Sequence, residues 1–179
     1  EASDAYVRPS GRLRIHTMTS FGQRYVIPAV SSYQKRYPDV AIELTLAQRV
    51  PDLLEEGFDV SLVLARELPD SGLIFRQLSS IYSVLCASPL YLEKHGAPQK
   101  PQELLKHHCL QLVSPVSPLD EWAMEGPDGK EVVAIKSNFH VNVAEAMLLA
   151  LKEGMGIGVL PLYSAVDALR AGTIVRVLP

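Results

Sequence analysis

The sequence is poor in cysteine and in aromatic residues, which excludes several classes of protein. Only two of its 179 residues are cysteines, and 7% are aromatic. Two cysteines are too few for a disulfide framework of the kind that holds small secreted domains together. Cys86 lies in an apolar run, where a small buried thiol is expected. This use of cysteine is consistent with a reducing compartment.

The sequence also lacks a basic excess and a long apolar run. It has 17 Lys and Arg against 20 Asp and Glu, and its basic residues are scattered along the chain. Binding of nucleic acid needs clustered basic side chains, so we do not expect this segment to contact DNA. No run reaches the roughly 18 apolar residues of a membrane span, and no signal sequence opens the chain. The first residue is Glu1, so we expect a segment upstream of it.

The first half of the sequence alternates strand and helix patterns. Leu13 and Ile15 alternate with polar residues, which predicts a strand at 12–18. A helix is expected at 21–37, with Thr19 or Ser20 as its N-cap and Pro28 either kinking it or marking its true first turn. A strand at 40–46, a short helix at 51–56 closed by Gly57, and an apolar strand at 59–64 follow. This order predicts a parallel sheet with helices on both faces.

The second half predicts another α/β unit. The patterns indicate strands at 73–78, 81–87, 109–113, 157–160 and 173–178, and a hairpin turn at 126–129 followed by strands at 132–135 and 136–141 or one bent strand. Helices are expected at 89–95, 143–152 and 162–169, the second capped by Asn142, with a turn at 102–107. We therefore expect a linker at 1–10 and lobes at 11–82 and 83–179. A ligand cleft is expected between the lobes, where strand carboxyl ends and helix N-termini converge.

Several strings along the chain are more specific than this architecture. They are GRLRI (11–15), SFG (20–22), RYPDV (36–40), LLEEGFD (53–59), ELPDS (67–71), GPDG (126–129) and GMGIG (154–158). In order and spacing, the sequence resembles the effector-binding (substrate-binding) domain of LysR-type transcriptional regulators, close to the CrgA-like branch. The resemblance runs in register from Gly11 to Pro179.

The resemblance implies a fold, a function and partners. The fold would be two Rossmann-like lobes of the type 2 periplasmic-binding-protein kind, with a C-terminal strand and helix missing from this chain. The function would be non-enzymatic sensing of a small-molecule effector in the bacterial cytoplasm, without a cofactor, a metal or a membrane. DNA would be bound only through an absent N-terminal winged-helix domain. The implied assembly is a homodimer, and a tetramer in the full-length protein.

The candidate effector contacts follow strands of both lobes. The loop after the first strand opens a helix, where N–H groups and the helix dipole attract anions, although plain N-capping explains its hydroxyls equally well. Arg66 either pairs with a carboxylate or lies exposed, and Gln48 and Arg49 either border the ligand or form a solvated loop. With the resemblance added, the expected effector contacts are Met18, Thr19, Ser20, Phe21, Gln48, Arg49, Ala65, Arg66, Ser114, Val141, Asn142 and Val143.

Two helices carry broad apolar faces that are mostly core. The resemblance implies that the first lobe of one subunit packs against the second lobe of another through helices at these places. The residues expected at this interface are Ala29, Ser32, Tyr33, Arg36, Met147, Leu148 and Leu151. A homodimer interface of this kind uses the same patches on both subunits.

Other residues invite functional interpretations that the spacing does not favour. The glycines at 154, 156 and 158 follow a helix and precede a strand, the reverse of a nucleotide-binding loop, so a C-cap turn is expected. His95, His107, His108 and Cys109 are given structural roles, because adjacent strand residues point to opposite faces. No nucleophile motif is present, so an enzyme would need a titratable cluster that the sequence does not show.

Two classes of function remain beside an enzyme. We favour a regulatory domain, and the alternative is a periplasmic solute-binding protein of a transporter, which would need an N-terminal signal. The helix N-termini and Arg66 favour a small carboxylate or another anion as the effector.

Overall fold

The computed structural model describes residues 8–65, 72–126 and 129–178. The chain divides into two compact units, residues 1–64 and residues 65–179, each with its own sheet. The break follows Leu64, whereas the lobe boundary expected from the sequence lies after Tyr82.

Unit 1 is a three-stranded parallel sheet in the order β2-β1-β3, as the alternating patterns predict. Its elements in chain order are β1 (Gly11–Thr17), α1 (Thr19–Phe21), the π-helical segment η1 (Gly22–Val26), α2 (Ile27–Arg36), β2 (Val40–Leu46), α3 (Leu53–Glu56) and β3 (Val60–Leu62). The strand predicted at 40–46 has those bounds, and Gly57 closes α3 with φ of 67° in the left-handed region, as expected.

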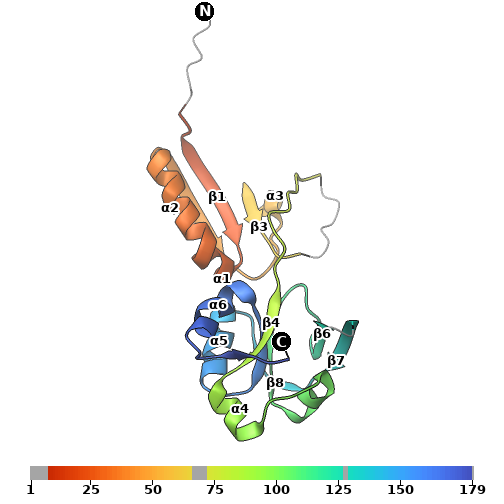
Figure 1. Cartoon of the computed structure of the whole chain (residues 1–179). Coiled ribbons are helices and arrows are strands. Elements are labelled where there is room, and N and C mark those ends of the chain that lie inside the picture. Colours follow the sequence, from red (N-terminus) through yellow and green to blue (C-terminus); the bar gives the residue numbers. More distant parts are fainter. Residues whose placement is uncertain (1–7, 66–71, 127–128, 179) are drawn as a thin grey trace, which may run out of the picture. The chain divides into compact units, whose positions relative to one another are not determined.

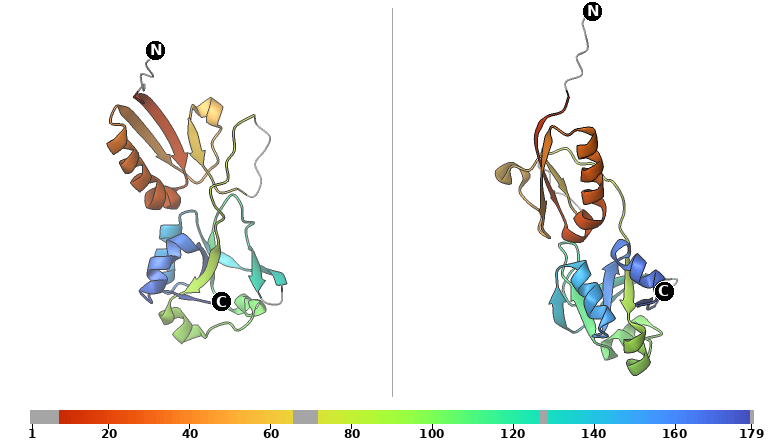
Figure 2. Two further views of the ribbon diagram at one scale, coloured as in Figure 1. Left: turned by 45° about the horizontal axis from the view of Figure 1, so that its top comes forward. Right: turned by 90° about the vertical axis from the view of Figure 1, so that its left-hand side faces the viewer.

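Alternation along β1 sends its side chains to two faces of this sheet. On one face, Thr17 lies against Gly22, and Figure 2 shows α2 along this side of β1. On the other face, Arg14 donates to the carbonyl oxygens of Glu56 and Gly57 at 2.8 and 2.7 Å, which satisfies the C-terminal end of α3. The two helices of unit 1 therefore contact opposite faces, as the crossover rule requires.

The helix of unit 1 begins two residues earlier than predicted and is not uniformly α-helical. It runs from Thr19 to Arg36 through five π-helical residues. Pro28 is the second residue of α2, and one residue separates it from the π-helical segment. A proline there has no N–H to donate to the preceding turn, and a wider turn accommodates that loss.

Unit 2 is built on a five-stranded mixed sheet in the order β10-β4-β9-β5-β8, with a separate β6–β7 hairpin. Its elements are β4 (Ser83–Ala87), α4 (Pro89–His95), the 3₁₀ helix η2 (Pro101–Lys106), β5 (Cys109–Leu112), β6 (Glu121–Gly126), β7 (Gly129–Ala134), β8 (Ser137–Val141), α5 (Ala144–Lys152), β9 (Ile157–Pro161), α6 (Leu162–Arg170) and β10 (Val175–Arg176).

Two apolar cores lie on the two faces of this sheet. One contains Cys86, Leu110 and Leu160 together with α5 and α6 residues such as Leu151. The other contains Cys109 with residues of α4, η2 and the β6–β7 hairpin. Figure 1 shows α5 and α6 on one side of β4 and the hairpin on the other. The two-sided burial explains why β4 and β9 are apolar at successive positions.

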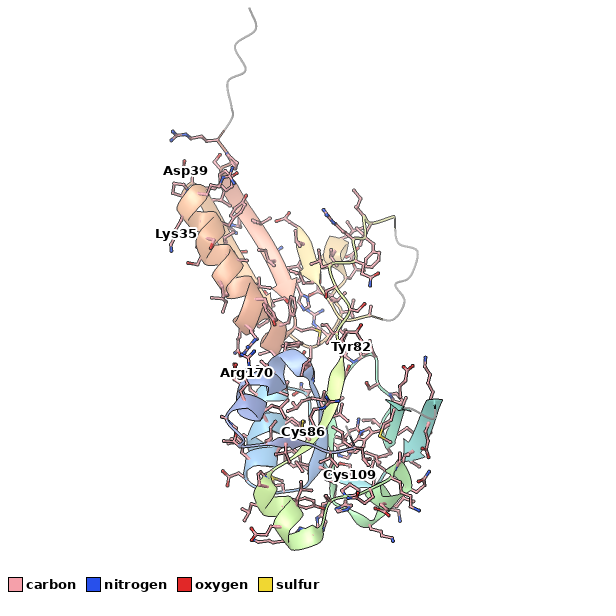
Figure 3. All side chains as sticks on the ribbon, in the orientation of Figure 1. Lys35, Asp39, Tyr82, Cys86, Cys109 and Arg170 are labelled. Carbon is pink, nitrogen blue, oxygen red and sulfur yellow. The ribbon has the colours of Figure 1, made fainter. Side chains whose placement is uncertain are left out.

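The two cysteines are the buried thiols that the sequence suggests. Cys86 and Cys109 both lie inside unit 2, one in each core (Figure 3), and each is a free thiol. Burial raises the pKa of each thiol to about 11. Because the thiolate is the reactive form, both groups are poor nucleophiles.

In unit 2, two predictions about local structure are wrong and one strand was missed. Described residues 72–82 form no strand at 73–78, and Leu73, Ile74, Phe75 and Leu78 are exposed. Strand β6, which carries the buried Trp122, was not predicted, because its three successive apolar residues at 122–124 hide the alternation. Asn142 is not the cap of α5, since Val143 holds the N-cap position without a capping side chain. The strand at 73–78 was wrongly predicted because a local sequence pattern cannot show whether a neighbouring strand is available for pairing.

Candidate functional site

The three strands of unit 1 end together. Thr17, the last residue of β1, is in register with Leu46, the last residue of β2, and with Leu62, the last residue of β3. The loops that follow these strands hold the predicted contacts of unit 1. Edges of this kind are where parallel α/β sheets place their ligands.

The chain passes from β1 into α1 with a single residue between them. Met18 is the N-cap residue, with an extended backbone (φ −64°, ψ 143°) and no side-chain cap. Thr19 and Ser20 are therefore not the N-caps that the sequence predicts. They lie in the first turn of the helix, where Ser20 is buried and Thr19 is half-buried. Phe21 follows them, with its ring 5.1 Å from that of Tyr25.

Gly22 holds the start of this helix close to the strand ends. A Cβ at this position would lie 2.5 Å from Thr17 Cγ2 and 2.5 Å from Leu46 Cδ2. Only glycine permits this approach without a shift of the helix. The close packing fixes the first helical turn relative to the carboxyl ends of β1 and β2.

Arg49, in the loop after β2, is paired rather than loose. Its Nη1 and Nη2 donate to the two carboxylate oxygens of Glu56 on α3. This hydrogen bonding lowers the pKa of Glu56 and raises that of Arg49. Both side chains are substantially exposed, so the pair contributes little to folding stability. Gln48 beside it is half-buried, and its Oε1 has no hydrogen-bond partner among the described residues.

His16 belongs to this edge and was missed as a candidate. It is fully buried, and its Nδ1 lies 2.9 Å from Ser61 Oγ on β3. Its ring meets Phe58 edge to face, with centroids 5.5 Å apart. Its Nε2 is buried and has no partner within the described part of the chain. The sequence showed only one more polar position in an alternating strand.

The buried His16 predicts a pH-dependent stability. Desolvation, and then the positive charge of Arg49, lower its pKa below 6.5, whereas Glu56 opposes the shift. The unfolded chain therefore binds more protons than the folded chain as pH falls through 6.5. We expect the free energy of unfolding to have its full value above pH 6.5 and to decrease as the pH falls towards the lowered pKa of His16. His107 in unit 2, also with a lowered pKa, adds to the effect.

Denaturant unfolding between about pH 8 and about pH 5, followed by circular dichroism, measures this dependence. The variant His16→Gln removes one of the two shifted groups, so its stability should change less with pH than that of the parent chain. An unchanged pH dependence in His16→Gln would show that His16 does not contribute.

The predicted contacts of unit 2 gather after β5 and β8. Ser114 Oγ accepts from Val116 N at 3.2 Å, so it stabilises its own turn. Val141 ends β8, and its carbonyl oxygen accepts from Val113 N at 2.7 Å. Asn142 is exposed, and Val143 is half-buried at the start of α5. The structure thus brings these four residues to one edge of the five-stranded sheet, because β5 and β8 are parallel.

Sequence reasoning also missed Gln111 at this edge of unit 2. Its side chain is buried, and Oε1 has no partner among the residues described. Gln111 lies near the end of β5, opposite His140 on β8. No pattern distinguishes it from a surface glutamine, since its burial comes from strands that are distant in sequence.

The remaining predicted positions are placed as follows. Ala65 is exposed, and Arg66 lies outside the described residues. On α2, four expected interface residues are exposed or nearly so, namely Ala29, Ser32, Tyr33 and Arg36. On α5, Met147 and Leu151 are fully buried in the core of their own unit, and Leu148 is half-buried. Leu149, which was not predicted, is 60% exposed on the same helix.

The histidines and glycines of unit 2 have the structural surroundings expected of them. Tyr91 is the centre of the histidine group: its hydroxyl accepts from His108 N at 2.9 Å and lies 3.2 Å from His107 Nδ1, and His95 stacks on its ring. Within the described ranges, no cluster of potential ligands could hold a metal ion. Gly154 has φ of 73° just after α5, so the glycine string begins with a helix-ending turn.

Comparison with known proteins agrees with this arrangement of two α/β units. Residues 7–179 match the family model described as the LysR substrate binding domain. The chain belongs to this family. The match spans nearly the whole chain, and the resemblance seen in its sequence strings is confirmed.

Curated relatives of this LysR domain are transcriptional regulators. It is 34% identical over 170 residues to the "Probable HTH-type transcriptional regulator LtrA" of Klebsiella pneumoniae, covering 94% of this chain and 54% of the relative. It is 29% identical over 179 residues to the "HTH-type transcriptional regulator DmlR" of Escherichia coli, covering 100% of this chain and 58% of the relative. The chain therefore spans little more than half the length of these relatives.

Solved structures show the same fold. The regulatory domain of CrgA from Neisseria meningitidis superposes with a TM-score of 0.81 at 30% identity, covering 95% of this chain and 82% of that one. Full-length AphB from Vibrio cholerae gives a TM-score of 0.81 at 30% identity, covering 95% of this chain and 57% of that one. The predicted α/β class of the type 2 periplasmic-binding-protein kind is thereby confirmed. None of the described helices is long and apolar enough to cross a membrane.

Proposed function

We propose that this chain is the effector-sensing part of a LysR-type bacterial transcriptional regulator. The observation that carries the proposal is the family match over residues 7–179. The curated relatives are transcriptional regulators about twice as long as the segment that matches this chain. In this proposal the DNA-binding domain lies outside the chain. The effector shifts DNA binding because it has different affinities for two arrangements of the protein.

We propose that the effector is contacted by residues of both units. In unit 1 they are Met18, Thr19, Ser20, Phe21, Gln48 and Arg49. Ala65 and Arg66 follow unit 1 in the sequence, and the contacts further along the chain are Ser114, Val141, Asn142 and Val143. The common end of β1, β2 and β3 supports the first group, and the shared edge of β5 and β8 supports the second. Arg49 would bind an anion by exchanging its partner Glu56 for the ligand.

The proposed assembly is a homodimer, with tetramers in the full-length cytoplasmic protein. The exposed residues of α2, together with the ring of Tyr33, whose centroid lies 4.8 Å from that of Tyr37, support a contact surface on unit 1. On α5 the surface would be carried by Leu149 rather than by the buried Met147 and Leu151. A periplasmic solute-binding protein is less well supported, since the relatives compared above are regulators.

A ligand screen tests the proposed function. Small carboxylic acids, aliphatic and aromatic, are titrated into the chain by calorimetry beside their uncharged amides, with thermal unfolding in parallel. An effector at a hundred times its Kd should stabilise the folded chain by about 2.7 kcal/mol. We expect some acids to bind. Failure of every acid and every amide to bind would count against an effector domain.

A matched pair of variants locates the anion contact in this screen. Arg49→Ala should lower the affinity for a bound acid about tenfold, because a charge-assisted hydrogen bond is lost. Lys35→Ala is the control, since Lys35 is a cation at the opposite edge of unit 1, beside Asp39 (Figure 3). Equal affinities of the two variants would remove Arg49 from the proposed site.

A further inference from the structure

Three buried polar atoms without partners lie close to the carboxyl ends of β1 and β2. Among the described residues of unit 1, they are His16 Nε2, Thr17 Oγ1 and Gln48 Oε1. His16 and Thr17 are the last two residues of β1, and Gln48 follows β2 by two residues. A buried polar atom without a hydrogen bond costs free energy, so such atoms are rare and need an explanation.

His16 is the most constrained of the three. Its Nδ1 lies 2.9 Å from Ser61 Oγ, and Ser61 is its register partner on β3. Phe58 packs against the ring edge to face. Two contacts therefore fix the imidazole, and Nε2 is the one ring nitrogen still able to bind a further group. Thr17 differs, since alternation sends it to the opposite face, against Gly22.

The charges around His16 decide what Nε2 can bind. Arg49 and Glu56 act on it from the loop after β2 and from α3, and they pair with each other. Arg14 and Glu43 lie on the same face, two residues back along β1 and β2, and are paired. Asp59 accepts from Arg14 N at 2.7 Å. Each of these charges has a partner on the protein, and burial, followed by the charge of Arg49, lowers the pKa of His16 below 6.5, so above that pH the imidazole without a ligand is mainly neutral.

The hydroxyl of Ser61 can donate to Nδ1 or accept from it, so it tolerates either tautomer and also the protonated ring. Nε2 is therefore able to donate a hydrogen bond to an oxygen atom. An anionic oxygen would also favour protonation of the ring, which burial disfavours in the protein alone.

We propose that His16 is a specificity-determining residue of the effector site, donating from Nε2 to an anionic oxygen of the effector. The inference rests on the proposed function, because it needs an effector to bind at this edge of unit 1. It adds a buried contact to the exposed Arg49, and it makes a carboxylate the recognised group. Binding of the carboxylate takes up a proton on His16, and an uncharged amide does not produce this uptake.

The test compares carboxylic acids with their own amides on the chain and on the variant His16→Gln. Calorimetry in two buffers with different ionisation enthalpies measures affinity and proton uptake together. For the parent chain, an acid that binds should do so at least about tenfold more tightly than its amide, with proton uptake between about pH 6 and about pH 8. In His16→Gln the proton uptake should disappear and the preference should weaken, because only Arg49 then contributes to it. His108→Asn, an exposed histidine of unit 2, is the control and should change neither.

Nuclear magnetic resonance of the imidazole nitrogens tests the inference without a substitution. The chain has five histidines, so the His16 signals can be assigned by comparison with single variants or by their coupling to the backbone. A bound acid should shift His16 Nε2 towards the protonated value and leave the other histidines unchanged. This measurement keeps the inference testable even if His16→Gln does not fold.

The outcomes separate this inference from the proposed function. Acids that bind with unchanged affinity and proton uptake in His16→Gln would overturn the role of His16 and leave the effector domain intact. Binding of amides alone would overturn the carboxylate and leave the effector domain intact. Failure of all compounds to bind would count against both.

Discussion

Leu151→Ala is expected to lower the free energy of unfolding of unit 2 by about 3 kcal/mol. Leu151 is fully buried in the core beneath α5 and α6. Truncation removes the transfer free energy of its side chain and leaves a cavity that a sheet and two helices cannot close. The loss is a large fraction of the stability of a domain of this size.

Fluorescence of the single tryptophan measures this effect in urea. Trp122 is 6% exposed and belongs to the core on the other face of the sheet, so it reports unfolding of unit 2 without touching the substituted site. The control is Lys152→Ala on the same helix, where the side chain is exposed and the change should stay within about 0.5 kcal/mol. Equal midpoints for the two variants would contradict the assigned face of α5.

Gly156→Ala is expected to destabilise unit 2 by about 3 kcal/mol. A Cβ on Gly156 would lie 2.2 Å from the carbonyl oxygen of His108, a backbone atom that no rotamer change can move. That oxygen also accepts from Ile157 N at 2.8 Å, which is where β9 begins its pairing with β5. Replacing glycine by alanine also lowers the conformational entropy of the unfolded chain. This stabilises the folded chain by about 0.4–1 kcal/mol, which is too little to offset the clash.

Gly126→Ala is the matched control, because a Cβ there meets no atom within 4 Å. Urea unfolding followed by Trp122 should show a lowered midpoint for Gly156→Ala and a nearly unchanged one for Gly126→Ala. If both variants unfold like the parent chain, the close approach of β9 to the carbonyl of His108 is not as described.

The sequence predicted those elements whose causes are local. Strands β1 and β2 alternate over seven residues each, and α4 begins after Ser88, whose side chain accepts from Tyr91 N. The predicted strand at 73–78 is a short apolar segment, but no neighbour pairs with it among the described residues. Strand formation depends on a partner, which a local pattern cannot reveal.

The candidate site was predictable to the level of loops, not of atoms. The residues after β1 and β2 were identified because the ends of parallel strands meet. His16 was missed because its burial and its contact with Ser61 join residues 45 positions apart. Arg49 was correctly placed beside the strand ends, but its pairing with Glu56 depends on where α3 lies. Met147 and Leu151 are apolar because they pack in the core of unit 2. An apolar stripe along a helix does not show whether it contacts this core or another subunit.

The π-helical turn at Gly22–Val26 determines the directions in which the following residues of the helix point around its axis. An α-helix advances about 100° per residue, so one extra residue in a turn rotates the following face by that angle. Deleting one residue from this turn would restore a regular helix and rotate α2 by about 100°, which would change the residues that it turns towards the sheet. The length of this segment therefore determines which residues of α2 face outward, more than the composition of α2 does.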